Sequence, residues 1–299
     1  MLSFRIKRTY SLHHFGAERA IQQLPEQMAK IQEALATGKR INRASDDPTD
    51  YLRGRKIETI QRRIETYQRN IDHARNWLQH AESALNKMTD LLSSMYELGV
   101  QAASETTSTE DRQLIADRME ALRAEMLDFA NGKFEGKYLF AGTATQTKPF
   151  QEVSGSILYQ GNTETPVRQI NDSQQIPVSI TGEDLQNVGG ATLFERIDNL
   201  INAVRTSDVP TISARNDALI EGRDHLLKLT TALGASSERL TITEEHLNTL
   251  NIALSEQQSE LEDVDMAEAL TQFQNTQLAY QSALKTTASI LKTSLLDYL

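Results

Sequence analysis

Apolar residues between positions 57 and 102 recur at alternating steps of three and four. The stripe consists of Ile57, Ile60, Ile64, Tyr67, Ile71, Ala74, Leu78, Ala81, Leu85, Met88, Leu92 and Met95, and continues through Gly99 and Ala102. A stripe that repeats every 3.5 residues faces a partner helix along its length only if the two helices supercoil. At ~1.5 Å per residue this helix would be roughly 70 Å long, so it needs a long partner. The alternative, a core helix of a large helical enzyme, more often shows a 3.6-residue period and a wider apolar face.

A second heptad pattern, in residues 219–261, predicts that partner. Leucine occupies every seventh position: Leu219, Leu226, Leu233, Leu240, Leu247, Leu254 and Leu261. The companion heptad position is mixed and contains Gly222, Leu229, Ser236, Thr243, Leu250 and Gln257. A leucine stripe beside small or polar residues allows two helices to approach closely. We therefore expect this segment to return antiparallel beside residues 57–102.

The two chain ends carry further heptad patterns. The first comprises Ala17, Ile21, Leu24, Met28, Ile31 and Leu35, and the second Met266, Leu270, Phe273, Gln277, Tyr280, Leu284, Thr287, Leu291 and Leu295. Neither has an obvious partner once the central helices are paired, so we expect the two to pair with each other. We interpret Gln277 as a buried amide that fixes helix register; the alternative is an exposed position in a weak heptad.

Local signals define where these helices begin and end. Pro25 predicts a kink or a late helix start, and Gly38 predicts a C-cap. Pro48 begins the long helix, with Asp46 or Asp47 as its N-cap. Residues 108–111 and the pair Asp265 and Glu268 resemble capping boxes that open later helices.

Residues 142–190 differ in composition from the rest of the chain. Proline, glycine, threonine, serine and glutamine separate short β-like runs at 156–160, 167–170 and 176–180, and residues 136–143 also read as strand. A bare loop of ~50 residues is uncommon in a compact domain, so we predict a small β-rich insert. A helix over 192–206 follows it.

These patterns predict a mainly α fold: a long antiparallel coiled-coil or helical-bundle rod built from both chain ends, with a small β-rich inserted outer domain. The expected domains are an inner coiled coil from residues 1–45 and 263–299, a helical rod from 46–141 and 192–262, and the insert at 142–191. Low aromatic content, 6%, agrees with extended helices better than with a compact enzyme.

Composition excludes several functions. The 299 residues carry a net charge of −10 with no strong basic run, which argues against nucleic acid and anionic membranes as partners. The chain has no cysteine, so thiol catalysis and zinc–thiolate sites are excluded. We expect no membrane span, and the segment 1–16 lacks the apolar run of a Sec-type signal.

No catalytic, cofactor or metal site emerges from the motifs. His73 and His80 are one heptad apart, roughly 10 Å, which is too far to share a metal without a bridging ligand. His13 and His14 have no third ligand nearby. The acidic cluster Glu260, Glu262, Asp263 and Asp265 lacks the spacing of an EF-hand loop. We expect a protein that is not an enzyme.

Several segments resemble the flagellin family. Residues 37–48 contain Gly38-Lys39-Arg40-Ile41-Asn42-Arg43-Ala44-Ser45-Asp46-Asp47, which is similar to the family's junction motif. Residues 97–104 are similar to another flagellin pattern, and residues 262–299 resemble the family's C-terminal segment. Residues 137–143, 149–150 and 158–161 resemble the outer-domain entry of the family members that join hook to filament. The resemblance covers residues 1–140 and 192–299.

The resemblance implies a structural protein of the bacterial flagellum, located outside the cell at the hook–filament junction. Copies of the chain would form a ring that meets hook-associated protein type 1 on one face and flagellin on the other. Export would proceed through the flagellar type III apparatus, with an export chaperone on the C-terminal helix. Two alternatives remain: a flagellin that forms the filament itself, and an intracellular coiled-coil adaptor.

Two residue sets carry this interpretation. The expected assembly interface comprises Ile21, Leu24, Met28, Ile31, Leu35, Leu270, Phe273, Gln277, Tyr280, Leu284, Leu291 and Leu295. The family junction motif comprises Gly38, Arg40, Ile41, Asn42, Asp46 and Asp47. Charged residues near this motif, including Arg43, form either ion pairs between subunits or local caps, and exposed pairs contribute only ~0–1 kcal/mol.

Overall fold

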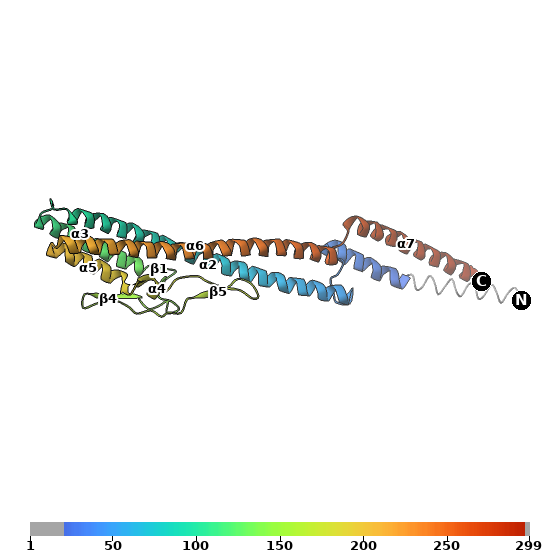
Figure 1. Cartoon of the computed structure of the whole chain (residues 1–299). Coiled ribbons are helices and arrows are strands. Elements are labelled where there is room, and N and C mark those ends of the chain that lie inside the picture. Colours follow the sequence, from blue (N-terminus) through green and yellow to red (C-terminus); the bar gives the residue numbers. More distant parts are fainter. Residues whose placement is uncertain (1–20, 297–299) are drawn as a thin grey trace. The chain divides into compact units, whose positions relative to one another are not determined.

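The computed structural model describes the backbone of residues 21–296 and the side chains of residues 21–289 (Figure 1). The predicted helix start near Ala17, the histidines His13 and His14, and the side chains of Leu291 and Leu295 lie outside these described parts. The chain divides into two compact units: residues 1–62 together with 250–299, and residues 63–249. The five-part domain division stays a prediction.

Two long helices confirm the central prediction. Helix α2 spans Pro48–Ala103 and helix α6 spans Val209–Glu262. Six of the heptad leucines of α6 are buried, Leu261 is half-buried, and the apolar stripe of α2 is buried or half-buried throughout. The helices are antiparallel within unit 63–249, because Gln68 donates to Asn248 Oδ1 at 2.7 Å and Arg75 pairs with Glu244.

The companion stripe of α6 deviates from the strict heptad. Gly222 is buried and Leu229, Ser236 and Thr243 are half-buried, in agreement with the pattern. Leu250 and Gln257, however, are exposed, and their neighbours Asn251 and Gln258 are half-buried instead. The inward positions therefore run 243, 247, 251 and 254. This extra step of four is a stutter, which locally unwinds a supercoil.

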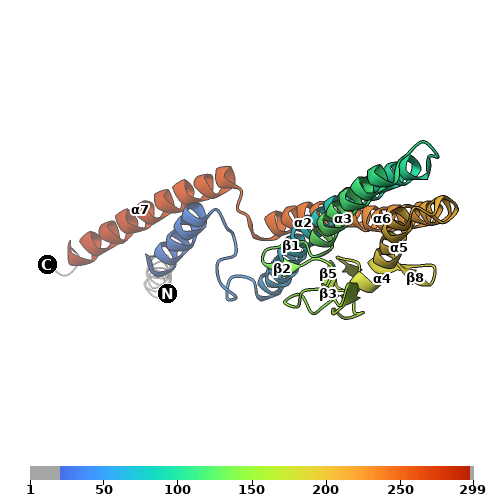
Figure 2. The ribbon, with the colours of Figure 1, turned by 90° about the vertical axis from the view of Figure 1, so that its left-hand side faces the viewer.

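Helix α2 also buries a third stripe that its heptad pattern did not predict. Trp77, Ala84, Leu91 and Leu98 are all buried. In unit 63–249 helix α3, Thr109–Ala130, runs beside α2, and the Trp77 ring meets Phe134 edge-on at 6.0 Å (Figures 1 and 2). This part of α2 has the wide apolar face of a helical bundle.

Capping residues define the shorter helices. Ser108 is the N-cap of α3, and its Oγ accepts from the Asp111 amide at 3.0 Å, as predicted. Helix α5, Leu193–Thr206, begins with a complete capping box between Thr192 and Glu195. The Arg112 side chain donates to the carbonyls of Ala102 and Ser104, which closes the C-terminus of α2.

The strand-rich segment is a set of separate two-stranded antiparallel hairpins. Their strands are β1 Lys133–Phe134 with β2 Lys137–Tyr138, β3 Phe150–Val153 with β4 Ser156–Tyr159, β5 Val167–Gln169 with β6 Gln175–Pro177, and β7 Asn187–Val188 with β8 Ala191–Thr192. The three predicted β-like runs correspond to β4, β5 and β6. The predicted strand at 136–143 is reduced to β2, and helix α4, Gly182–Gln186, was not predicted.

Phe140, Phe150 and Tyr159 anchor this segment. The two phenylalanines are fully buried, and Phe150 contacts the rings of Tyr159 and Phe194. The Tyr159 hydroxyl donates to Asn162 O at 2.7 Å. Its ring lies where a Cβ on Gly182 would approach to 2.3 Å, so only glycine fits there. Burial raises the pKa of the Tyr159 phenol.

Two helices complete the other unit. Residues 21–37 are helical and contain Pro25, so this helix does not begin after the proline. Helix α7 spans Met266–Leu296, and both ribbon views show it running alongside residues 21–37 (Figures 1 and 2). Gly38 ends the first helix with φ +72 and donates its amide to Ala34 O at 2.8 Å. The predicted C-cap is therefore confirmed.

Candidate assembly site

The junction motif is held against the end of α6 by backbone hydrogen bonds. The Arg40 amide donates to Glu262 O at 2.5 Å, and the Val264 amide donates to Gly38 O at 2.9 Å. Lys39 and Asp263 form an antiparallel bridge at this point. We call the paired segments 38–43 and 261–264 the clasp. It joins residues more than 200 positions apart in the sequence.

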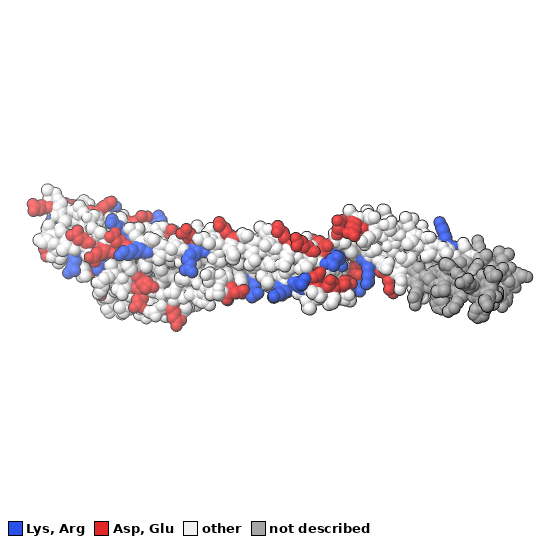
Figure 3. All heavy atoms as spheres, turned by 45° about the vertical axis from the view of Figure 1, so that its right-hand side comes forward, with Lys and Arg blue, Asp and Glu red and all other residues white. Residues whose placement is uncertain are grey.

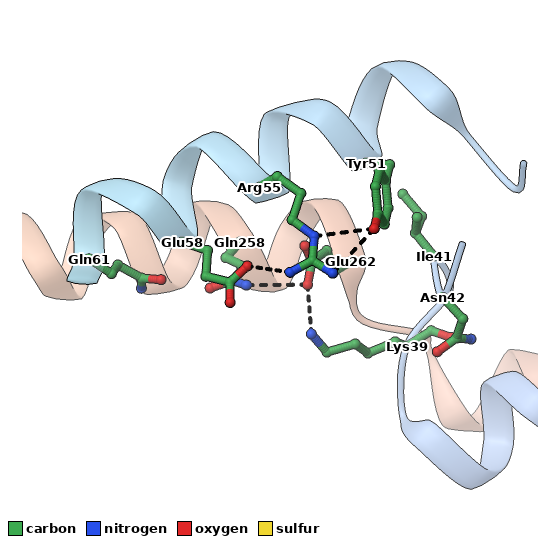
Figure 4. A pocket seen from close by; sticks show the side chains of 9 residues that line it. All are labelled: Lys39, Ile41, Asn42, Tyr51, Arg55, Glu58, Gln61, Gln258 and Glu262. Atoms are coloured by element: carbon green, nitrogen blue, oxygen red, sulfur yellow. Dashed lines mark hydrogen bonds and ion pairs between the residues drawn. The ribbon is translucent and has the colours of Figure 1, made fainter. Parts of the chain in front are cut away.

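Glu262 is the central side chain of the clasp (Figure 4). Its Oε2 accepts from Lys39 Nζ at 2.7 Å and from Gln258 Nε2 at 3.2 Å. Its Oε1 lies 2.1 Å from the position that a Cβ on Gly54 would occupy. Gly54 of α2 therefore provides the space that the Glu262 carboxylate fills.

The clasp borders a polar cleft of about 270 Å³. Charged groups that line it are bonded within the chain: Arg55 pairs with Glu58 at 2.6 Å and donates to Tyr51 Oη at 3.2 Å, and Lys39 pairs with Glu262 (Figure 4). These bonds hold the first turns of α2 and the end of α6 in place. The cleft therefore has a structural explanation that needs no ligand.

The acidic pair of the motif caps local structure. Asp47 is the N-cap of α2, because its Oδ1 accepts from the amides of Thr49 and Asp50 at 3.0 Å each. Asp46 Oδ2 accepts from the amides of Arg43 at 2.9 Å and Asn42 at 3.1 Å. These two backbone donors, Arg43 first, lower the pKa of Asp46 below its ordinary value.

The arginines of the motif also bond within the chain. Arg40 donates to Leu261 O at 2.8 Å and pairs with Asp50 at 3.2 Å. Arg43 pairs with Glu33 through both carboxylate oxygens, at 3.0 and 3.2 Å. The sequence left open whether these charged groups form local caps or ion pairs between subunits. Within one chain they form local caps and local ion pairs. Ion pairs between subunits stay a prediction.

Each of the two terminal helices has one face that is partly buried. Along residues 21–37 the predicted stripe is half-buried: Ile21, Leu24, Met28, Ile31 and Leu35. On α7 the predicted positions Phe273, Tyr280 and Thr287 are half-buried as well. Small residues occupy the second inward position of α7, with Ala269 buried and Thr276 and Ala283 half-buried.

The sequence predicted that Leu270, Gln277 and Leu284 face the partner helix, and within the chain this prediction was wrong. Leu270 is 50% exposed, Leu284 is 42% exposed and Gln277 is exposed. Gln277 is not the buried register amide that its apolar neighbours suggested. The helix is rotated so that alanine and threonine face inward, because small side chains let two helices approach closely, and the leucines remain outside.

The exposed surface of α7 is almost uncharged and includes several large apolar side chains. Between residues 269 and 289 the only charged residue is Lys285. Met266, Leu270, Leu278 and Leu284 are exposed there, and the helix is mostly white in the charge-coloured view (Figure 3). We call this set the outer apolar face of α7. Clustered exposed apolar residues mark interaction surfaces.

The other candidate sites of the sequence analysis have structural explanations. His80 stacks on Phe134 with ring centroids 4.4 Å apart, and His73 is exposed. Within the described residues no group of three or more His, Asp or Glu side chains is arranged to hold a metal. The described helices include none that is long and apolar enough to cross a membrane.

Sequence reasoning missed the role of Gly54, and it placed Glu262 in an acidic cluster without identifying its partners. One signal was available: a glycine in a helix interior is unfavourable, so its presence asks for a packing reason. The partner, more than 200 residues away, was not identifiable from local pattern.

The long antiparallel helix pair, the terminal helices joined through the clasp and the uncharged outer face of α7 define a helical structural protein with surfaces suited to assembly. Residues 12–145 match the family model of the bacterial flagellin N-terminal helical region, and residues 219–299 match that of the flagellin C-terminal helical region. The chain belongs to the flagellin family. It is a structural component of the bacterial flagellum and not an enzyme.

Individual relatives agree with this assignment. Flagellar hook-associated protein 3 of Escherichia coli is 26% identical, with 89% of this chain and 91% of that protein covered. A flagellin of Halalkalibacterium halodurans is 27% identical over 85% of this chain and 84% of its own length. A putative flagellar hook-associated protein from Vibrio parahaemolyticus has the same fold, with a TM-score of 0.68, 22% identity, and coverage of 73% of this chain and 100% of that one.

Proposed function

We propose that this chain is a hook-associated protein of type 3, the junction component between hook-associated protein type 1 and the flagellin filament. In this proposal copies form a ring through their terminal helices, outside the cell at the hook–filament junction. The similarity to flagellar hook-associated protein 3 along nearly the full length of both chains supports this choice within the family.

The outer apolar face of α7 is the observation that carries the proposal. Helix pairing within the chain uses Ala269, Thr276 and Ala283 and leaves Leu270 50% exposed and Leu284 42% exposed. A helix optimised for a lone monomer would turn its leucines inward, because each buried leucine contributes ~1.5–3 kcal/mol. The arrangement suits burial against neighbouring copies, where an almost uncharged surface has no ions to desolvate.

The clasp has a complementary role in this proposal. Copies in a ring need their terminal helices to leave the long helices in one fixed direction. The backbone bridge between Lys39 and Asp263, together with the Lys39–Glu262 pair, provides such a fixed connection within each chain. Ring contacts through the terminal helices are then reproducible from copy to copy.

The same surface has a role in export in this proposal. In the proposal the chain travels unfolded through the flagellar type III apparatus, and an export chaperone covers the outer apolar face of α7 until assembly. The absence of cysteine from the sequence agrees with folding outside the cell without disulfides.

Deletion of the gene from its own organism, followed by electron microscopy of the flagella, tests the junction role. We expect hooks without filaments and flagellin shed into the medium, with filaments restored by the complete chain. Normal filaments on the deletion strain would reject the role.

Two alternatives predict different behaviour. A flagellin would polymerise by itself into long filaments when purified, and the similarity to the Halalkalibacterium halodurans flagellin favours testing this directly. An intracellular coiled-coil adaptor would be recovered only from cytosol and never from sheared flagella.

A further inference from the structure

The leucine stripe of α6 does not specify one register against α2. Leucine occupies every seventh position from Leu219 to Leu261. A slip of seven residues, roughly 10 Å, replaces each leucine by another leucine. The facing stripe of α2 repeats with the same period and is apolar at nearly every step. The leucine stripe alone therefore does not distinguish the native register from the slipped one.

A buried polar side chain of α6 in unit 63–249 makes a contact that does not repeat along the helix. Asn216 of α6 is buried, with 4% of its surface exposed, and its Oδ1 has no hydrogen-bond partner in the described part of the chain. It faces Gly99 of α2, where a Cβ would lie 2.1 Å from Oδ1 and 2.6 Å from Cγ. The amide therefore fits only because residue 99 has no side chain.

The position of the glycine is specific to one register. Gly99 belongs to the heptad position that carries Leu92, Leu85 and Leu78 in the preceding heptads. A slip of seven residues in one direction sets the buried amide against Leu92. A slip in the other direction carries it past Ala103, where α2 ends. Only the native register gives Asn216 a glycine.

The other unit contains a similar pair. Helix α2 has two glycines, Gly54 and Gly99. Gly54 faces Glu262 of α6, whose Oε1 would lie 2.1 Å from a Cβ. Each glycine of α2 thus makes room for one polar side chain of α6.

We propose that Asn216 and Gly99 form a register lock that selects the native alignment of α2 and α6 over the alignment shifted by one heptad. Asn216 lies three residues before Leu219, outside the leucine stripe. A buried asparagine between paired helices fixes register at a cost in stability, because its amide is poorly paired. The lock suits helices that are distant in the sequence and lack a short connecting turn to align them. In this account Asn216 is a positioning residue that acts through helix alignment.

Engineered cysteine pairs measure the register, since the natural chain has no cysteine. Gln68 and Asn248 are in contact at 2.7 Å, so Gln68→Cys with Asn248→Cys reports the native alignment. Gln68→Cys with Thr241→Cys reports the slip that sets residue 216 opposite Leu92. Each pair is placed in the full chain with and without Asn216→Leu, and the yield of cross-link by a short bifunctional thiol reagent is measured after refolding from denaturant.

We expect only the native pair to cross-link when Asn216 is present. With Asn216→Leu the yield of the slipped pair should rise roughly tenfold or more, because the penalty against that alignment is removed. Thr231→Leu, at an exposed position of α6, is the matched control and should leave the yield of the slipped pair at its background.

Asn216→Ala is a second variant, because it removes the amide without adding volume. It must raise the yield of the slipped pair as well, and circular dichroism verifies that both variants are helical. Background yield of the slipped pair in both helical variants would overturn the proposal. So would a slipped cross-link already abundant with Asn216 present.

Discussion

Lys39 and Glu262, 223 positions apart in the sequence, form an ion pair with Nζ and Oε2 separated by 2.7 Å. The pair lies beside two backbone hydrogen bonds that join the same segments, those from Arg40 to Glu262 O and from Val264 to Gly38 O. The Glu262 side chain is 13% exposed and the Lys39 side chain 45% exposed. The carboxylate is therefore held in the structure, while the ammonium remains in contact with water.

Replacement of Glu262 should open the clasp locally. In Glu262→Ala the Lys39 and Gln258 side chains lose their shared acceptor, with an expected destabilisation of ~1–2 kcal/mol, which corresponds to roughly 5- to 30-fold faster local opening. Hydrogen exchange of the Arg40 and Val264 amides measures this opening. Glu260→Ala, at an exposed position two residues away, is the control and should leave both rates unchanged. Equal protection in the two variants would show that the backbone bridge alone holds the clasp.

Gly99→Ala should destabilise the chain although alanine is the better helix former. The new methyl group meets the buried Asn216 amide, for which we expect a loss of roughly 1–3 kcal/mol in denaturant unfolding. Gly234→Ala on α6 is the matched control, since nothing lies within 4 Å of its Cβ. It should gain ~0.5–1 kcal/mol from helix propensity. The double variant Gly99→Ala with Asn216→Ala should recover most of the loss, and a purely additive double mutant would contradict the contact.

Helical organisation could be predicted from the sequence because heptad burial is a local, periodic property. The leucines of α6 and the stripe of α2 are apolar at regular steps, and their burial follows from the pattern alone. The caps at Ser108, Asp47 and Gly38 were equally readable, since each depends on backbone groups within a few residues.

The periodic pattern could not predict which side chains make the contacts between segments that are distant in the sequence. The heptad pattern predicts that Leu250, not Asn251, faces α2, yet Asn251 is the more buried of the two. Next along this face, Gln258 donates to Glu262 in the clasp, a contact that apolar periodicity does not contain. On α7 the same rule selected Leu270 and Leu284, whereas pairing within the chain uses alanine and threonine.

The Asp46 turn should make the clasp region sensitive to acid. The amides of Arg43 and Asn42 stabilise the ionised carboxylate, which lowers its folded pKa below 3.8. The folded state therefore binds its proton less readily than the unfolded chain, so the stabilisation is present above pH 3.8 and is lost as the pH falls through the folded pKa. An NMR titration of the Asp46 carboxyl should give a pKa below 3.8. In Asp46→Asn the difference in stability from the natural chain should shrink as the pH falls through this window, and a difference independent of pH would contradict the assignment.

The outer apolar face of α7 is the part of the proposal that assembly tests most directly. Leu270→Asp with Leu284→Asp adds two carboxylates at exposed positions, so the monomer should keep its fold. The matched control is Gln272→Asp with Thr286→Asp, which adds the same charge at exposed polar positions two residues after each leucine, on a different side of the same helix. Burying unpaired carboxylates against a neighbouring copy is strongly unfavourable.

The decisive measurement is electron microscopy of flagella from a deletion strain that expresses each double variant, with circular dichroism of the purified proteins as a check on folding. We predict bare hooks and shed flagellin with the leucine variant, and filaments with the control variant. Normal filaments on hooks that carry the leucine variant would contradict assembly through this face.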